Sequence, residues 1–344
     1  MIKIQQFGKL SDGQVASIYT IVNKNGNRLS ITNYGGRVVS FLIKDKIGDF
    51  HDLLLGYDDL NGYIEDKHLL GANICYNLVT NIDDIKNSDS VFFDKSLWDV
   101  VTAGQEGEES IVLSNSYLID EQNKLDISVT YSLSEDDQII IKEWAHSSCD
   151  VCCDFVQSLF FNLNSQTSIE AHTAVVNADM CSATNKGFSA EEFEQVKGRV
   201  NLNKPKSFKN LSAAKHSLIK NADGLDLYYL LRNDGVKADE KDRDLYYVGR
   251  VRGRTLGIKM EVYTTKPGLY LYTANRFDGL LGKKQATIES NFVQPLNDFD
   301  NVNSRKNSIY DKHSGFCISP TTHRNIVKSN EQYKNCTVYK FVTR

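Results

Sequence analysis

The chain has 344 residues, with 40 Lys and Arg against 44 Asp and Glu and a net charge of −4 at pH 7. This balance leaves no basic excess for a nucleic-acid-binding face, so the expected partners are small or neutral molecules. The first residues lack the charged-then-apolar pattern of a signal peptide, and no run of about 18 apolar residues would span a membrane. We therefore expect a soluble, cytoplasmic protein that binds neither nucleic acid nor a membrane.

Short runs rich in β-branched and aromatic residues begin near residue 15 and recur along the chain, separated by turns such as Asn23-Lys-Asn-Gly26 and Asn33-Tyr-Gly-Gly36. Several alternate apolar and polar residues, as half-buried strands do. The predicted strands cover residues 15–22, 28–34, 38–44, 52–55, 110–118, 125–132, 138–146, 154–162, 171–179, 228–231, 246–251, 255–265, 268–273 and 336–342.

Helical signals are few. Residues 58–63 could form one helical turn, and Ser189 and Glu192 have the spacing of a capping box before Phe193. The polar segments 201–220 and 297–312 are predicted to be surface loops. No linker or repeat divides the chain, so we expect one all-β domain over residues 1–344, a large antiparallel β-sandwich.

Seven cysteines are scattered along the chain except for Cys149, Cys152 and Cys153. A metal or redox site would need a second Cys or Cys/His pair at a suitable distance, and none is present. Reduced thiols are therefore the favoured interpretation, and we expect no metal and no other cofactor.

Several runs occur in an order that is specific when they are taken together. They are Ile31-Thr-Asn-Tyr-Gly-Gly36, Leu54-Leu-Gly-Tyr-Asp-Asp-Leu-Asn-Gly-Tyr63, Phe161-Asn-Leu163, His172 with Ala178-Asp179, Gly224-Leu-Asp226, the run from Glu261 to Asn275, Gly315-Phe-Cys317 and Tyr339-Lys-Phe341. This ordered set, which spans nearly the whole chain, resembles the aldose 1-epimerase (galactose mutarotase) family.

The resemblance implies a mutarotase-like supersandwich with a sugar cleft on a concave sheet, and a free aldose as the partner. The family interconverts the α and β anomers of a hexose. A base takes the proton of the C1 hydroxyl while an acid protonates the ring oxygen. Mapped onto this chain, the resemblance places His172 at the acid and Asp226 at a sugar-holding aspartate.

Other positions depart from the family pattern. Ser319 stands where the family has its glutamate base, and a serine hydroxyl does not act as a general base at neutral pH without an activator. Ser158 stands at a second histidine, Thr80 at a sugar-holding arginine and Tyr270 at a sugar-contacting glutamine. Tyr270 could instead stack on a sugar ring. We expect these residues to line the sugar site.

Each of these residues also has an ordinary structural interpretation. His172 could be a hydrogen-bonded strand histidine, and Asp226 could cap the turn after Gly224. Glu261 and Glu289 are carboxylates that could replace the missing base, although no spacing brings either near His172.

Three functional hypotheses follow. In the first, the chain binds a carbohydrate and has lost or impaired mutarotase activity because Ser319 replaces the base. In the second, it is an active epimerase or related sugar isomerase with His172 as the acid and a replacement base. In the third, it is a glycan-degrading enzyme on a similar sandwich, which would need a pair of carboxylates at a set separation.

Overall fold

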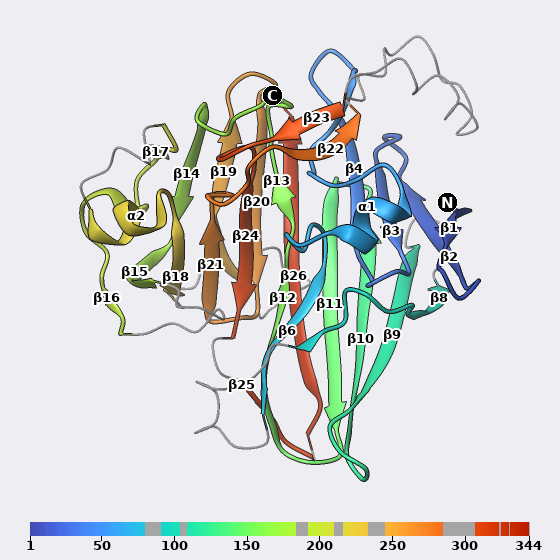
Figure 1. The fold of residues 1–344 in the computed structure, drawn as a ribbon. Coiled ribbons are helices and arrows are strands. Elements are labelled where there is room, and N and C mark those ends of the chain that lie inside the picture. The colour runs from blue at the N-terminus through green and yellow to red at the C-terminus, as the bar shows by residue number, and fades with distance from the viewer. Residues whose placement is uncertain are drawn as a thin grey trace.

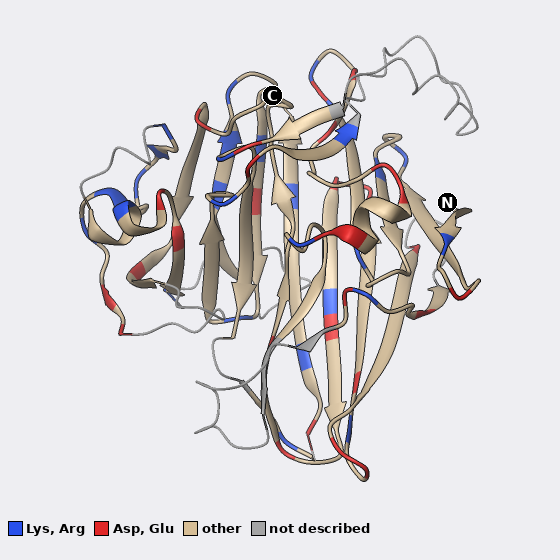
Figure 2. Ribbon diagram, viewed as in Figure 1, with Lys and Arg blue, Asp and Glu red and all other residues tan. Residues whose placement is uncertain are grey.

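The computed structural model describes residues 1–79, 91–103, 109–183, 192–209, 216–232, 245–284, 307–322, 325–329 and 331–343. Within these residues the chain is built almost entirely from antiparallel strands in five sheets (Figure 1). The all-β sandwich prediction is confirmed. Charged residues of both signs are spread over strands and loops in the view of Figure 2. No helix among the described residues is long and apolar enough to cross a membrane.

The largest sheet has nine strands in the order β17-β14-β19-β20-β26-β11-β10-β9-β8. On strand after strand one face carries polar residues and the other enters the core, which is why these segments alternate in sequence. The strands are β8 (Asp99–Ala103), β9 (Ser110–Leu118), β10 (Lys124–Leu133), β11 (Gln138–Ser147), β14 (His172–Val176), β17 (Lys206–Ser207), β19 (Tyr246–Gly253), β20 (Ile258–Thr264) and β26 (Tyr333–Thr343).

A six-stranded sheet has the order β13-β24-β21-β18-β15-β16. Apolar residues of its inner face share a single core with the nine-stranded sheet. Its strands are β13 (Phe160–Phe161), β15 (Ala178–Ala183), β16 (Glu194–Gln195), β18 (Asp226–Leu231), β21 (Gly268–Tyr272) and β24 (Phe316–Thr321).

Three smaller sheets complete the fold. The N-terminal sheet contains β1 (Ile2–Lys9), β2 (Val15–Val22), β3 (Arg28–Thr32), β4 (Val38–Lys44) and β5 (Phe50–Asp52) in sequence order. A four-stranded sheet has the order β25 (Asn325–Val327), β12 (Val151–Gln157), β6 (Asn73–Val79) and β7 (Val91–Phe92). The strands β22 (Leu280–Lys284) and β23 (Asn307–Tyr310) pair with each other.

Helices are short. The turn predicted at 58–63 is α1 (Leu60–Glu65), with Asp59 accepting a hydrogen bond from the Gly62 N–H. The prediction that 201–220 is only loop is wrong, because this stretch contains β17 and part of α2 (Ser217–Ala222), preceded by a 3-10 turn at Gly198–Val200. Likewise, β23 lies within the predicted loop 297–312. Ser189, the predicted capping residue, lies outside the described residues.

Candidate functional site

One face of the six-stranded sheet carries a group of tyrosines. Side chains alternate along a strand, so on β21 Leu269 and Leu271 enter the core while Tyr270 and Tyr272 point to the other face. Strand pairing places three further residues beside them: Tyr228 and Ser319 flank Tyr270, and Asp226 lies opposite Tyr272. We call Asp226, Tyr228, Tyr270, Tyr272 and Ser319 the tyrosine face.

The three aromatic rings pack against one another. The ring centroids of Tyr228 and Tyr270 are 5.4 Å apart, and those of Tyr270 and Tyr272 are 6.1 Å apart with an interplanar angle of 10°. Tyr228 and Tyr270 are 2% and 7% exposed, whereas Tyr272 is only half-buried. Tyr272 is therefore the tyrosine of this group that a ligand reaches most readily.

Asp226 lies at one end of the tyrosine face. Its Oδ1 accepts a hydrogen bond of 3.1 Å from the Tyr270 hydroxyl, and its Oδ2 is 3.7 Å from the Arg276 guanidinium, whose side chain is 81% exposed. Burial, with a smaller contribution from the Asp226 carboxylate, raises the pKa of Tyr272 to about 12. The site therefore offers the Asp226 side chain close to the protonated Tyr272 phenol, and groups of both kinds can hydrogen-bond to sugar hydroxyls.

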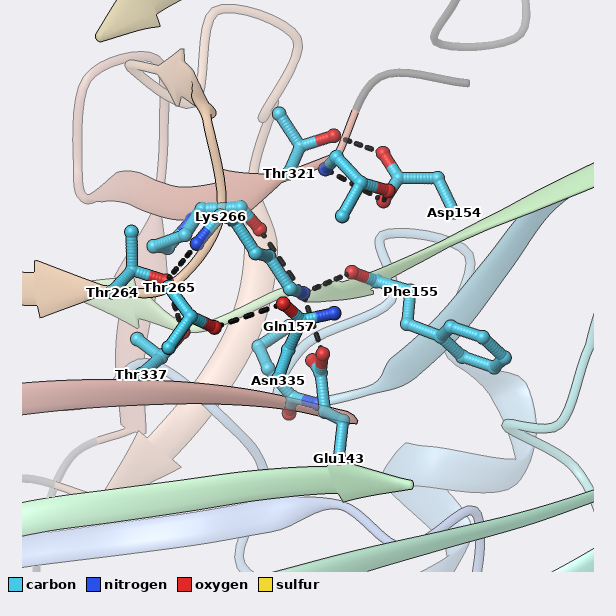
Figure 3. A network of polar contacts seen from close by, with 12 residues as sticks. Glu143, Asp154, Phe155, Gln157, Thr264, Thr265, Lys266, Thr321, Asn335 and Thr337 are labelled. Atoms are coloured by element: carbon cyan, nitrogen blue, oxygen red, sulfur yellow. Dashed lines mark hydrogen bonds and ion pairs between the residues drawn. The ribbon is translucent and has the colours of Figure 1, made fainter. Parts of the chain in front are cut away.

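A second carboxylate, Asp154 on β12, lies near the other side of Tyr228. Asp154 accepts bonds from Thr321 Oγ1, from the Thr322 N–H at 3.0 Å and from Thr322 Oγ1 at 2.7 Å (Figure 3). Burial raises the pKa of Tyr228 well above its ordinary value, and the charges of Asp154 and Asp226 add to this effect. The sequence analysis missed Asp154 because its neighbours come from a distant strand.

Ser319 and Ser158 lie close to each other in the fold. Ser319 is fully buried, and its hydroxyl accepts a hydrogen bond of 3.1 Å from the Gln157 N–H. Ser158 follows directly and is 8% exposed, with its N–H and C=O bonded to Ala72 and Gly71. Thr80, the third predicted polar replacement, lies outside the described residues.

His172 lies elsewhere. Its Nε2 accepts the Leu163 N–H at 2.9 Å, and its Nδ1 is 3.0 Å from the Ile169 carbonyl, so Nδ1 carries the proton. The ring packs edge-on against Phe316, with centroids 5.7 Å apart. On β24, Phe316 points into the core and Ser319 points to the opposite face.

The structure therefore does not bring His172 together with Asp226, Tyr270 and Ser319. Burial lowers the pKa of His172 to about 4, and both ring nitrogens already have backbone partners. This is the geometry of a hydrogen-bonded strand histidine. The role of catalytic acid predicted for His172 has no support in this arrangement.

Of the two carboxylates named as replacement bases, the one that the structure describes, Glu261, does not complete the tyrosine face. Glu261 alternates with the core residues of β20 and forms an ion pair of 2.7 Å with Lys259 on the solvent-facing side of the nine-stranded sheet. Glu289 lies outside the described residues. Among the described residues, no group of three or more His, Cys, Asp or Glu is placed to hold a metal ion.

Sequence comparison with known proteins identifies the family to which the chain belongs. The family model described as aldose 1-epimerase matches residues 17–340. The chain is 24% identical to the galactose mutarotase of Homo sapiens over 355 residues, covering 91% of each protein. It is 23% identical to that of Rattus norvegicus over 376 residues, covering 97% of each. The chain belongs to the aldose 1-epimerase family.

Solved structures show the same architecture. A galactose 1-epimerase from Lactobacillus acidophilus NCFM superposes with a TM-score of 0.75 at 16% identity, covering 99% of this chain and 98% of that one. An aldose epimerase homologue from C. elegans gives a TM-score of 0.71 at 18% identity, covering 94% and 98%. At these identities the likeness establishes the fold and leaves the reaction open.

Proposed function

We propose that this chain binds a carbohydrate, a free aldose, on the tyrosine face and interconverts its anomers weakly or not at all. The observation that carries this proposal is the burial and hydrogen bonding of Ser319. Its side chain is fully buried and its hydroxyl accepts a hydrogen bond from the Gln157 N–H. The family resemblance assigns the glutamate base to this position. A general base contributes about 10² to 10⁴ in rate, so its replacement removes much of the acceleration.

Sugar binding is supported by the groups that remain. Tyr272 presents a half-buried ring, which suits the C–H face of a pyranose, and Asp226 lies directly across from it on β18. Asp226 is 8% exposed, so a ligand would contact only the small part of its carboxylate that reaches the surface. An accessible aromatic ring and a neighbouring carboxylate thus support sugar recognition without the family's glutamate base.

The test measures the binding of galactose and of glucose to the full chain by ligand-observed NMR. We expect saturable binding that weakens at least about tenfold in Tyr272→Ala and in Asp226→Asn, since each removes one contact of the tyrosine face. Tyr247→Ala is the matched control, because Tyr247 is also half-buried but packs on Tyr263 in the nine-stranded sheet. Absence of binding, or equal loss in the control, contradicts the proposal.

A second candidate is an active sugar isomerase with a replacement base. The observation in its favour is the Asp226 carboxylate, which has the Tyr270 hydroxyl as a neighbouring proton donor at 3.1 Å. In this case the wild-type chain would accelerate anomer exchange, and Asp226→Asn would abolish that acceleration while the chain stays folded.

A further inference from the structure

A buried lysine, Lys266, lies in the connection between β20 of the nine-stranded sheet and β21 of the six-stranded sheet. It is 1% exposed, and its ammonium forms an ion pair of 2.6 Å with Glu143 on β11. Nζ also donates to the Phe155 carbonyl at 2.6 Å and to the Pro320 carbonyl at 3.5 Å. One ammonium thus links strands of three different sheets (Figure 3).

The two carbonyls that accept hydrogen bonds from Lys266 belong to residues next to Asp154 and Ser319 in the sequence. Phe155 follows Asp154 on β12, and Pro320 lies between Ser319 and Thr321 on β24. The Thr321 hydroxyl donates to the Asp154 carboxylate, while the Lys266 ammonium donates to the carbonyls of the neighbouring residues Phe155 and Pro320. The strands β12 and β24 are therefore joined in two ways, by the Asp154–Thr321 side-chain contact and by the Lys266 ammonium, which binds a carbonyl of each strand.

The loop that carries Lys266 is itself fixed. Thr264 Oγ1 accepts the Lys266 N–H at 3.2 Å and lies 3.1 Å from Thr337 Oγ1. Thr265 Oγ1 donates to Asn335 at 2.9 Å. Beside the ion pair, a cavity of about 10 Å³ lined by Glu143, Gln157 and other residues has room for no more than one water. The backbone of Lys266 is therefore held in place, and its ammonium has little room to move.

We propose that Lys266 is a positioning residue for the candidate site, holding β12 and β24 at the spacing that sets Ser319 of the tyrosine face and the neighbouring residues Ser158 and Asp154. The ligand-binding part of this proposal rests on the proposed function. The positioning part does not, because it concerns the Gln157 to Ser319 contact that exists without ligand.

The test uses the double variant Lys266→Met with Glu143→Leu. Removing one partner alone leaves an unpaired buried charge, whereas replacing both partners with apolar residues avoids that penalty. Amide hydrogen exchange, measured by mass spectrometry, then gives the exchange rate of the peptide covering β12 and β13 and that of the peptide covering β10. We expect exchange at least about tenfold faster in the first peptide only, together with weaker galactose binding.

The control is Leu29→Ala, a fully buried truncation in the N-terminal sheet that lowers stability without touching the network. Exchange of the β12 and β13 peptide at the wild-type rate, or a matching increase in Leu29→Ala, overturns the proposal. If the wild-type chain binds no sugar, the proposed function fails while the exchange comparison still decides the positioning role. If the double variant does not fold, Lys266→Gln with Glu143→Gln is measured in the same way, with the same two outcomes.

Discussion

At the scale of single residues, burial decides which titratable groups can do chemistry. His172 has the residue type that proton transfer at neutral pH requires, yet its ring is fully buried between backbone partners. Desolvation disfavours the imidazolium, so the neutral form dominates and no ring nitrogen is left for a substrate. The histidine therefore stabilises the fold in a pH-dependent way.

The pKa of His172 gives a stability prediction. Its folded value of about 4 lies below the unfolded value near 6.5, so the unfolded chain binds more protons between these limits. The stabilisation is complete above pH 6.5 and is lost as the pH falls toward 4, at about 1.4 kcal/mol per pH unit once His172 titrates in the unfolded chain. We expect urea unfolding midpoints to fall between pH 6.5 and 4.5.

The variant His172→Gln separates this contribution from other titrating groups. Glutamine keeps one donor and one acceptor but does not titrate, so the pH slope in this range should be smaller than in the wild-type chain by about one proton. An unchanged slope would show that His172 is not the group responsible.

At the scale of elements, a buried arginine joins the turn after β3 to two loops. Arg37 is 0% exposed and forms ion pairs of 2.6 Å with both Asp66 and Asp94. The Tyr57 hydroxyl donates to the other oxygen of Asp66 at 2.9 Å. These contacts fix the approach to β6 and β8, which no local sequence pattern predicted.

Replacing Arg37 with methionine should lower the free energy of unfolding by about 3–5 kcal/mol, because two buried carboxylates lose their counter-charge. Chemical denaturation measures this loss. The combination with Asp66→Asn and Asp94→Asn should recover part of it, and a triple variant no more stable than Arg37→Met would contradict the electrostatic explanation.

The short helix α1 depends on its first residue. Asp59 accepts the Gly62 N–H at 3.0 Å, satisfying a donor that the helix itself cannot pair. Asp59→Ala should therefore cost about 1 kcal/mol in unfolding free energy, whereas Asp59→Asn, which can still cap, should stay close to the wild-type value. Equal losses in both variants would assign the effect to the charge of Asp59 and not to its capping bond.

At the scale of the whole molecule, local alternation predicted many of the strands but not how they pair into sheets. The segments 15–22, 38–44 and 110–118 coincide with β2, β4 and β9, because one face of each strand enters the core. The strand β1 was not predicted: it is an edge strand whose residues are mostly half-buried or exposed, so it carries little apolar signal. That residues 1–344 form a single domain stays a prediction.

The candidate site was predictable only in part. Asp226 and Tyr270 were named from the sequence and prove to be hydrogen-bonded neighbours, and alternation places Tyr228 on the same face as Asp226. Asp154 and Lys266 could not be found in this way, since they reach the site through contacts between distant strands. His172 was assigned to the site although its strand belongs to another sheet.

We propose that this member of the aldose 1-epimerase family binds a sugar on the tyrosine face and interconverts its anomers weakly or not at all. The most direct measurement is anomer exchange of galactose and glucose, followed by NMR or polarimetry with wild-type protein and with buffer alone. The predicted result, at sugar concentrations where binding is saturated, is a rate equal to that in buffer or less than about tenfold above it. Acceleration of about 10²-fold or more that is lost in Asp226→Asn would contradict it.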